Sequence, residues 1–369
     1  MKPEVVRVEV PGAPYEVAIG PGLLDDIGRR VRLVSKAEKV AVLSDDNVND
    51  LFGTIVERRL GEAGYEVHSL SVTPGEESKC WAVAGQVLET LAEFKLGRGD
   101  LIVALGGGVI GDLAGFAAAT YLRGIGFVQV PTTLLAQVDS SVGGKTGVDL
   151  RAGKNLAGAF KQPMLVAADT TALSSLPQRE WASGLAEVVK SAVIDSEEFL
   201  GWLEGNAEAL RGKEPSVVAA AVRRSVEFKA AVVSADEKEL GVRECLNYGH
   251  TLGHAIENVA GYGVVSHGEA VAEGMRFAAA LAVKVCGASP EFVRRQGDLL
   301  DSLGLDSLDV ALDPEEVLRA MRNDKKVRLG SIRWVLPTLP GQWSCRPVEE
   351  SAVLELLEAW SKSKGKGSR

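Results

Sequence analysis

Short apolar segments alternate with helical patterns over the first part of the chain, and this alternation restricts the fold more than any other feature. Three segments have the composition and length of buried strands, at residues 39–43, 65–72 and 100–105. Three others have helical patterns, at residues 48–63, 79–94 and 113–120. Before them, residues 5–19 alternate apolar and polar side chains around a turn at residues 11–14, which indicates an antiparallel hairpin. Strands that alternate with helices predict an α/β domain with a mostly parallel sheet, whose ligands bind at the carboxyl ends of the strands.

The pattern changes after about Ala168. Residues 177–290 are rich in Ala, Val, Leu and Glu at helical spacing and carry little sign of strand. A late strand is indicated at residues 331–336, followed by a Pro-Gly turn and an extended segment at residues 343–347. We therefore expect an α/β domain, a mainly α-helical domain and a disordered low-complexity tail, over residues 1–170, 171–360 and 361–369.

Composition limits the class of protein and its partners. The length of 369 residues and the apolar content of 46% allow two domains, each with a buried core. The net charge of −9 is spread along the chain, with no long basic run before the last few residues, which argues against nucleic acid and an anionic membrane as partners. No N-terminal pattern resembles a signal peptide, and no apolar run approaches the roughly 20 residues that span a bilayer, so we expect a cytoplasmic protein. The four cysteines are far apart and form no CxxC pair, which predicts reduced thiols.

A glycine-rich turn follows the strand that ends near Leu105. Residues 106–112, Gly-Gly-Gly-Val-Ile-Gly-Asp, match the GxGxxG pattern between a strand and a helix. Glycines at these positions let the backbone approach a pyrophosphate, which the N-terminus of the helix then stabilises. A tight strand-to-helix turn without a ligand is the alternative. The usual dinucleotide fingerprint lies at the first strand, with an acidic residue about 20 positions later. Here the motif follows a later strand and Asp112 lies directly behind it.

A basic cluster lies between residues 123 and 161 of this otherwise acidic chain. It holds five basic residues and two acidic ones, which are Arg123, Lys145, Arg151, Lys154 and Lys161 against Asp139 and Asp149. Serine, threonine and glycine residues are interleaved at positions 140–146. Their hydroxyls and backbone N–H groups, beside ammonium groups, are a common way to hold phosphate. A solvated basic loop is the alternative interpretation.

Histidine is scarce in this chain, yet three of its four histidines lie within 18 residues, at His250, His254 and His267. His250 and His254 share one face of a helix with Glu257, which lies one turn further on. Neutral imidazoles with a carboxylate make a site for zinc or a similar divalent ion, with one position open for substrate. Structural histidines are the alternative.

One further pair of charged residues lies on the helix that follows Pro177. Glu187 and Lys190 are three positions apart. Such i,i+3 spacing is most often that of a surface ion pair.

Together these segments resemble the 3-dehydroquinate synthase family, and the resemblance covers nearly the whole chain. Its most specific stretches are residues 106–112, 130–155, 246–257 and 267–269. The second begins Val-Pro-Thr-Thr-Leu-Leu-Ala-Gln-Val-Asp-Ser-Ser-Val-Gly-Gly-Lys-Thr-Gly and ends at Lys154-Asn155. The resemblance implies an N-terminal NAD-binding α/β domain, a mainly helical C-terminal domain and an active site in the cleft between them.

The resemblance also implies a role for individual residues. The metal ligands would be Glu187, His250 and His267, which makes His254 a substrate contact where helix spacing alone would have paired it with His250 as a ligand. The NAD-binding residues would be Asp45, Asn47, Glu76, Lys79, Gly107, Gly108, Asp112, Thr132 and Thr133. The substrate contacts would be Asp139, Lys145, Lys154, Asn155, Lys190, Lys229, Arg243, Asn247 and His254. Arg123 would reach across a homodimer interface, and either Lys325 or Lys326 would complete the phosphate pocket.

The reaction that the resemblance implies converts 3-deoxy-arabino-heptulosonate 7-phosphate, an anionic sugar phosphate, to 3-dehydroquinate and phosphate, with bound NAD and zinc or cobalt. Arg243 favours this substrate, because a guanidinium matches a carboxylate in bidentate geometry and the substrate is a 2-keto acid. Two alternative activities are a metal-dependent polyol or alcohol dehydrogenase and a cyclase that acts on another sugar phosphate. A non-catalytic NAD-binding regulator with a structural metal is a third.

Overall fold

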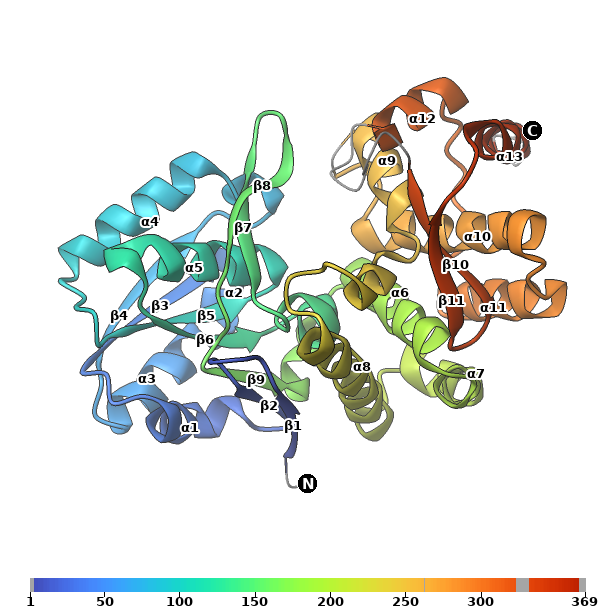
Figure 1. Ribbon diagram of the computed structural model, residues 1–369. Helices are drawn as coiled ribbons and strands as arrows, with labels where there is room; N and C mark the ends of the chain where they lie inside the picture. The colour runs from blue at the N-terminus through green and yellow to red at the C-terminus, as the bar shows by residue number, and fades with distance from the viewer. Residues whose placement is uncertain (1–2, 262, 323–331, 365–369) are drawn as a thin grey trace. The chain divides into compact units, whose positions relative to one another are not determined.

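The computed structural model describes residues 3–261, 263–322 and 332–364 of the chain. The chain divides into two compact units (Figure 1). The first unit comprises Met1–Leu176 and Val218–Lys238, and the second comprises Pro177–Val217 and Glu239–Arg369. Lys325 and Lys326, of which one was expected to contact phosphate, lie outside the described residues.

A seven-stranded sheet forms the centre of the first unit. Its strands, in spatial order, are β1 (Glu4–Val8), β2 (Tyr15–Gly20), β9 (Leu165–Asp169), β6 (Gly126–Pro131), β5 (Leu101–Gly106), β3 (Lys39–Asp45) and β4 (Glu66–Val72). Only β1 and β2 pair in antiparallel fashion, and the other neighbours are parallel. The expected hairpin and mostly parallel sheet are thus confirmed.

Helices cover both faces of this sheet (Figure 1). On β5, Leu101, Val103 and Leu105 pack on one face with α1 (Ile27–Val34) and α3 (Thr54–Glu62). Ile102 and Ala104 pack on the opposite face with α4 (Trp81–Glu93) and α5 (Gly108–Thr120). Because successive side chains of a strand point to opposite faces, a strand covered on both sides is apolar throughout. This explains the continuous apolar segment in the sequence.

The order of the strands fixes where a ligand can bind. The chain passes from β3 to β4 at the edge of the sheet and then returns to β5, on the other side of β3. The connections that follow β3 and β5 therefore diverge. In open parallel sheets, ligands bind at the carboxyl ends of the strands beside such a point.

Sequence patterns did not assign β6 and β9, and two further parts of the first unit differ from the sequence-based expectation. The later part of the basic cluster, residues 145–160, folds into a hairpin of β7 (Lys145–Leu150) and β8 (Gly153–Phe160), which sequence patterns did not indicate. Most of α8 (Pro215–Ala235) belongs to this unit, whereas we had expected it in the helical domain. Two side-chain contacts hold the helix there: Ser234 accepts a hydrogen bond from the backbone of Glu9, and Arg223 pairs with Glu4. A helical pattern in the sequence does not reveal such contacts.

The second unit is mainly helical, as expected. Its long helices are α6 (Gln178–Asp195), α7 (Glu197–Arg211), α9 (His250–Ala260), α10 (His267–Cys286), α11 (Pro290–Ser302), α12 (Pro314–Arg322) and α13 (Glu350–Ser363). The late strands form a hairpin of β10 (Arg333–Leu339) and β11 (Gln342–Pro347).

The expected tail at residues 361–369 is wrong in its first part, because α13 continues to Ser363. Ser361 donates a hydrogen bond to the backbone of Leu312, and Lys364 forms a buried ion pair with Glu273. These contacts order residues whose composition alone suggests a frayed end.

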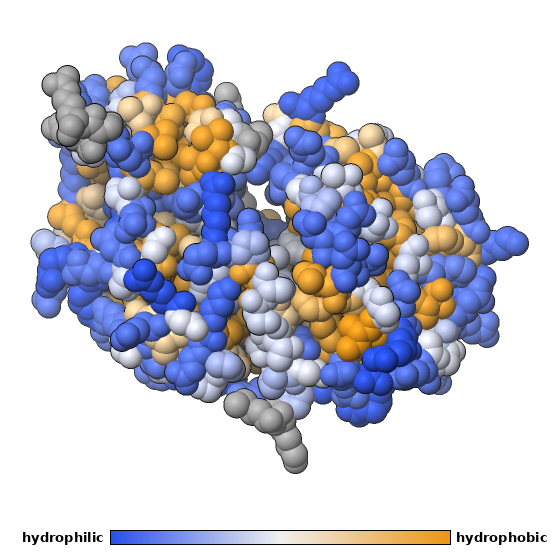
Figure 2. Space-filling view, turned by 180° about the vertical axis from the view of Figure 1, so that it is seen from behind, coloured by the Kyte–Doolittle hydropathy of each residue, from blue (hydrophilic) through white to orange (hydrophobic). Residues whose placement is uncertain are grey.

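The surface in Figure 2 is covered mostly by hydrophilic residues, with smaller apolar areas between them. Within the described part of the chain, no helix is long and apolar enough to cross a membrane.

Candidate functional site

Three helices of the second unit bring Glu187, His250 and His267 together. Glu187 lies on α6, His250 begins α9 and His267 begins α10. The helices approach closely because glycines stand at their contacts. A Cβ on Gly268 would lie 2.2 Å from the Cα atom of Ser183 on α6, and one on Gly274 would lie 1.9 Å from the carbonyl oxygen of Gly249. Residues far apart in the sequence thus share one cluster.

The ligand atoms of this cluster have the spacing of a metal site. The Nε2 atoms of His267 and His250 lie 3.3 and 3.5 Å from Oε1 of Glu187. Two ligand atoms bound to one tetrahedral zinc ion lie about 3.4 Å apart, because each is about 2.1 Å from the metal. Two imidazoles and one carboxylate are also a ligand set that leaves a fourth position for substrate. The residues therefore fit a divalent ion.

Both histidine rings are oriented through their other nitrogen. Nδ1 of His250 lies 3.0 Å from the carbonyl oxygen of Tyr248, and Nδ1 of His267 lies 3.2 Å from Oε2 of Glu257. A ring whose Nδ1–H is donated to such an acceptor presents an unprotonated Nε2 to a metal. Sequence reasoning missed the carbonyl of Tyr248, because a backbone contact leaves no signal in the residue types.

The two carboxylates beside His267 change the pKa of its imidazole. Burial acts to lower the pKa of His267, but hydrogen bonds and negative charge from Glu187 and Glu257 outweigh it and raise the pKa to about 10. Because an imidazole must be neutral to bind a metal, an ion that enters here displaces this proton.

Glu187 and Lys190 form an ion pair, but not the surface pair that their spacing indicated. The two side chains are 0% and 2% exposed, and the ammonium group contacts Oε2 of Glu187 in the interior of the unit. The i,i+3 spacing was therefore interpreted wrongly, because it does not reveal that α6 is buried on almost every side. A buried pair of this kind costs desolvation energy and is weak evidence for stability.

His254 lies beside the cluster without joining His250 as a ligand. In the described chain, two groups of residues could hold a metal. One is Glu187 with His250 and His267, and the other is Glu257 with His254 and His267. Neither contains both His250 and His254, whose rings are 5.3 Å apart and nearly perpendicular. The pairing suggested by helix spacing alone is thus wrong, because Nε2 of His250 faces α6.

Two other predicted substrate contacts lie on the turn before α9. Arg243 and Asn247 belong to the short helix η7 (Val242–Asn247). The Arg243 side chain is buried, and Nδ2 of Asn247 donates a hydrogen bond to Glu239 at 2.6 Å. The Asn247 side chain is thus held in place by a contact within the second unit.

The predicted NAD-binding residues of the first unit lie at or after the carboxyl ends of four parallel strands. Asp45 and Asn47 are at or after the end of β3, and Gly107 and Gly108 follow β5. Gly107 is the N-cap residue of α5, and no side chain among the described residues accepts a hydrogen bond from the first turn of that helix as a cap. A Cβ on Gly107 would lie 3.0 Å from Thr133, and one on Gly108 would lie 3.1 Å from Ser140. The glycines therefore keep open the N-terminus of a helix, where phosphate binds well.

The remaining predicted NAD-binding residues follow β4 and β6 or begin α5. Lys79, which is buried, pairs with Asp112 at 2.6 Å. Burial acts to lower the pKa of Lys79, but the charges of Asp112 and Glu76 raise it above its ordinary value. Thr133 accepts a hydrogen bond from Ala136, and the buried hydroxyl of Thr132 has no hydrogen-bond partner among the described residues. An uncapped helix, a glycine-lined turn and an unsatisfied hydroxyl fit a dinucleotide.

The substrate contacts predicted in the first unit fall into two groups. Asp139 and Lys229 form one ion pair, with 2.7 Å between Oδ1 and Nζ. Lys145, Lys154 and Asn155 lie on the β7–β8 hairpin. Nζ of Lys154 is 3.8 Å from Oε1 of Glu76, which links the basic cluster to the predicted NAD-binding residues.

Arg123 lies apart from these groups, at the end of the short helix η4 (Tyr121–Arg123). Leu122 and Arg123 have φ values of 50° and 67°. Such values are uncommon for residues other than glycine and cost conformational energy.

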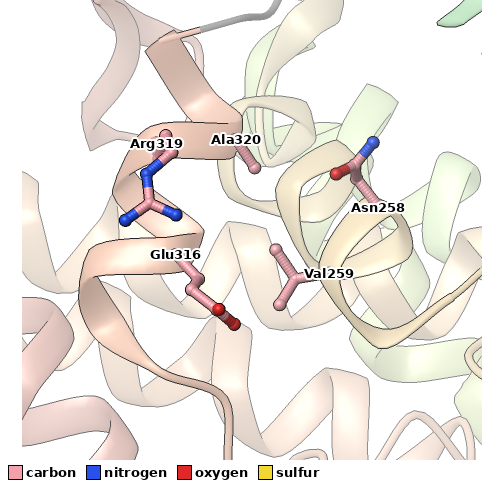
Figure 3. A pocket seen from close by; sticks show the side chains of 5 residues that line it. All are labelled: Asn258, Val259, Glu316, Arg319 and Ala320. Carbon is pink, nitrogen blue, oxygen red and sulfur yellow. The ribbon is translucent and has the colours of Figure 1, made fainter.

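A pocket between α9 and α12 contains none of the predicted site residues. Figure 3 shows Asn258 and Val259 of α9 facing three residues of α12, which are Glu316, Arg319 and Ala320. Its polar side chains are exposed and include no imidazole, thiol or pair of carboxylates. This pocket therefore supports no catalytic chemistry.

Comparison with family models gives two matches that together cover most of the chain. Residues 69–183 match the model described as 3-dehydroquinate synthase N-terminal, and residues 184–327 match the one described as 3-dehydroquinate synthase C-terminal.

Individual proteins are similar to this chain over almost its full length. A curated 3-dehydroquinate synthase of Bordetella pertussis is 47% identical over 96% of this chain and 99% of that protein. A solved structure of 2-deoxy-scyllo-inosose synthase, complexed with carbaglucose-6-phosphate, NAD+ and Co2+, is 27% identical, with a TM-score of 0.87 over 96% of this chain and 100% of the other. ValA, the 2-epi-5-epi-valiolone synthase from Streptomyces hygroscopicus, with NAD+ and Zn2+ bound, is 26% identical, with a TM-score of 0.86 over 95% of this chain and 97% of the other.

Proposed function

The chain belongs to the 3-dehydroquinate synthase family, and from this membership we propose that it converts 3-deoxy-arabino-heptulosonate 7-phosphate to 3-dehydroquinate and phosphate. The observation that carries the proposal is the cluster of Glu187, His250 and His267, whose ligand atoms have the spacing of a zinc site. A carbon–oxygen lyase that works with a metal and NAD is the enzyme class that follows. As a shikimate-pathway enzyme it would act in the cytoplasm.

We assign the divalent ion to Glu187, His250 and His267, and NAD to the turn at Gly107 and Gly108 with the surrounding strand ends. When bound, the metal supplies a Lewis acid for adjacent hydroxyls and NAD supplies a reversible oxidation of one alcohol. Two similar solved structures hold NAD+ with Co2+ or Zn2+, which supports both assignments.

The polar side chains account for binding of a multiply anionic substrate. Lysines neutralise a departing phosphate, and we assign Lys145, Lys154, Lys190 and Lys229 to contacts with the substrate. Arg243 would pair with the substrate carboxylate through two parallel hydrogen bonds. His254 lies close to the predicted metal ligands but is not one of them, so it suits contact with a substrate hydroxyl.

We also propose a homodimer in which Arg123 reaches the partner's substrate. Two features of the first unit support this: the exposed turn at Leu122 and Arg123, and the exposed apolar side chains of Leu150, Leu156 and Phe160 on the β7–β8 hairpin. Light scattering in solution tests the dimer, and a monomer at micromolar concentration would contradict it.

The test of function is to incubate metal-loaded protein with catalytic NAD and 3-deoxy-arabino-heptulosonate 7-phosphate while following phosphate and NADH absorbance together. We expect phosphate in large excess over NAD, no accumulation of NADH, and loss of both phosphate release and product on adding a chelator. A metal-dependent dehydrogenase would instead build up NADH on simple polyols and release no phosphate. The basic residues at 145–161 favour the synthase over that alternative, because a polyol gives them no anion to bind.

A further inference from the structure

The imidazole of His267 is held between two carboxylates from different helices. Its Nε2 atom lies 3.3 Å from Oε1 of Glu187 on α6, and its Nδ1 atom lies 3.2 Å from Oε2 of Glu257 on α9. Rotating the ring by half a turn would place carbon atoms against both carboxylates. One orientation is therefore strongly favoured, with Nε2 directed towards the other two predicted ligands.

Glu257 occupies an interior position that a carboxylate does not take without a partner. Its side chain is 8% exposed. Moving an ionised carboxylate out of water is costly unless it is paired or hydrogen-bonded. Glu257 lies two turns along α9 from His250, so the same helix supplies one predicted ligand and the carboxylate that orients another.

The two histidines differ in the acceptor that their Nδ1 atom meets. His250 faces a neutral carbonyl oxygen, that of Tyr248, whereas His267 faces a carboxylate. A carboxylate acceptor makes the imidazole a more basic ligand and adds a negative charge beside the ion. The two rings are thus expected to contribute unequally to metal affinity.

We propose that Glu257 is a positioning residue of the metal centre, which orients His267 and strengthens it as a ligand without binding the metal itself. This inference rests on the metal site of the proposed function. The alternative is the second possible ligand group, His254, Glu257 and His267, in which Glu257 would bind an ion directly.

Geometry favours the positioning role over direct ligation. If Glu257 and His267 bound the same ion, His267 would have to use Nδ1, and its Nε2 atom would then be lost to Glu187 and His250. With Nε2 as the ligand atom, Glu187, His250 and His267 serve one ion and Nδ1 keeps its hydrogen bond to Glu257. Only the second arrangement uses both contacts of the ring.

The experiment measures the affinity of the metal-free protein for Co2+ by competition with a chromophoric chelator, together with the visible absorption of the bound Co2+. No substrate is needed. Glu257→Gln keeps the size of the side chain and an acceptor oxygen but removes the charge. We expect it to weaken binding about 10–100-fold and to alter the Co2+ spectrum, which is the usual effect of losing such a partner.

Glu269→Gln is the matched control. Glu269 lies two residues after His267, but its carboxylate accepts a hydrogen bond from Ser266 and pairs with Arg179. Its variant is expected to keep Co2+ affinity and spectrum within about twofold, even where it lowers thermal stability by loss of the capping contact.

A direct ligand serves as the second reference. Glu187→Gln removes a predicted ligand and should lose more affinity than Glu257→Gln. Equal and complete loss in both would overturn the proposal, because Glu257 would then be a ligand. Unchanged affinity and spectrum in Glu257→Gln would overturn it as well.

Failure of the proposed function gives a different result. If the unmodified protein binds no Co2+, the metal site itself is wrong and this inference falls with it. Should Glu257→Gln not fold, Glu257→Asp keeps the charge and withdraws the carboxylate by one methylene. Glu257→Asp is expected to bind Co2+ more weakly as well. Wild-type affinity for Co2+ in this variant would contradict the role of the contact between Glu257 and His267.

Discussion

Nζ of Lys229 lies 2.7 Å from Oδ1 of Asp139, although the two residues are 90 positions apart in the chain. The Lys229 side chain is 8% exposed and that of Asp139 is 25% exposed. The contact draws α8 into the first unit and holds an ammonium group in one position. Both residues are predicted substrate contacts, so the pair would hold the Lys229 ammonium group in a fixed position in the proposed site.

Lys229→Met removes this charge and keeps most of the side-chain volume. We expect kcat/KM for the sugar phosphate to fall about 10–100-fold, because a hydrogen bond to a charged group contributes roughly 1.5–3 kcal/mol. Binding of NAD, measured by calorimetry, should change less than twofold. Lys238→Met at an exposed position of the same unit is the control, and equal kinetic losses in the two variants would contradict the role of Lys229.

Arg243→Ala should weaken binding of the substrate far more than binding of NAD. The guanidinium is predicted to hold the substrate carboxylate, and none of the predicted NAD-binding residues belongs to the second unit. Arg243→Lys keeps the charge but not the planar fork, so it should recover only part of the loss. Calorimetric titration with each ligand provides the measurement, and equal losses for substrate and NAD would refute the assignment.

Gly268→Ala tests how the metal cluster is assembled. A Cβ at this position would lie 2.2 Å from the Cα atom of Ser183, so α10 would have to move away from α6. We expect a loss of about 1–3 kcal/mol in the free energy of unfolding, as for other overpacked sites, and weaker Co2+ binding. Gly201→Ala on α7 is the control, because a Cβ there would have no atom within 4 Å to displace. Urea unfolding of that variant should show a gain of about 0.5–1 kcal/mol.

Sequence patterns predicted some of the buried strands of the sheet but did not assign β6 and β9. The apolar segments of β3 and β5 are buried on both faces and were found, as was the hairpin of β1 and β2. The β7–β8 hairpin was missed, because its strands contain glycines and charged residues and were interpreted from their charge alone. The placement of α8 was missed because a helical period does not tell which unit the helix packs against.

The candidate site was predictable from sequence only in part. Three clustered histidines indicated a metal, but spacing along one helix favoured His250 with His254. Glu187 lies 63 positions before His250 in the sequence, and only the family resemblance connected them. The close contacts made by Gly268 and Gly274 bring these helices together, and they depend on packing that no local pattern records.

Burial should protect Cys245 from alkylation. Burial raises the pKa of Cys245 to about 12 and that of Cys345 to about 11. The unfolded thiol has a pKa near 8.5, so the unfolded state loses its proton at a lower pH than the folded state does. The free energy of unfolding therefore decreases as the pH rises above about 8.5. At pH 8, iodoacetamide should modify the buried Cys245 at least 100-fold more slowly than Cys80, which, like Cys345, is partly exposed. Mass spectrometry of the peptides measures the rates, and equal rates for Cys245 and Cys80 would contradict the protection of Cys245 by burial.

The C-terminal helix is held by a buried ion pair between Lys364 and Glu273, whose side chains are 6% and 2% exposed. Glu273 lies on α10, the helix that begins with His267, and it also accepts hydrogen bonds from Trp360 and Leu308. Lys364→Met leaves this carboxylate buried without its ammonium partner. We expect a loss of about 3 kcal/mol in the free energy of unfolding, because breaking a buried pair leaves an uncompensated charge.

Lys362→Met is the matched control for that variant. Lys362 pairs with Glu358 on the same helix, and its side chain is 78% exposed. Exposed pairs of this kind contribute about 0.3–0.5 kcal/mol at most, so the two lysine variants should differ by more than about 2 kcal/mol in urea unfolding. A difference below about 1 kcal/mol would mean that Lys364 is solvated in solution, and the C-terminal end would then be as frayed as its composition suggests.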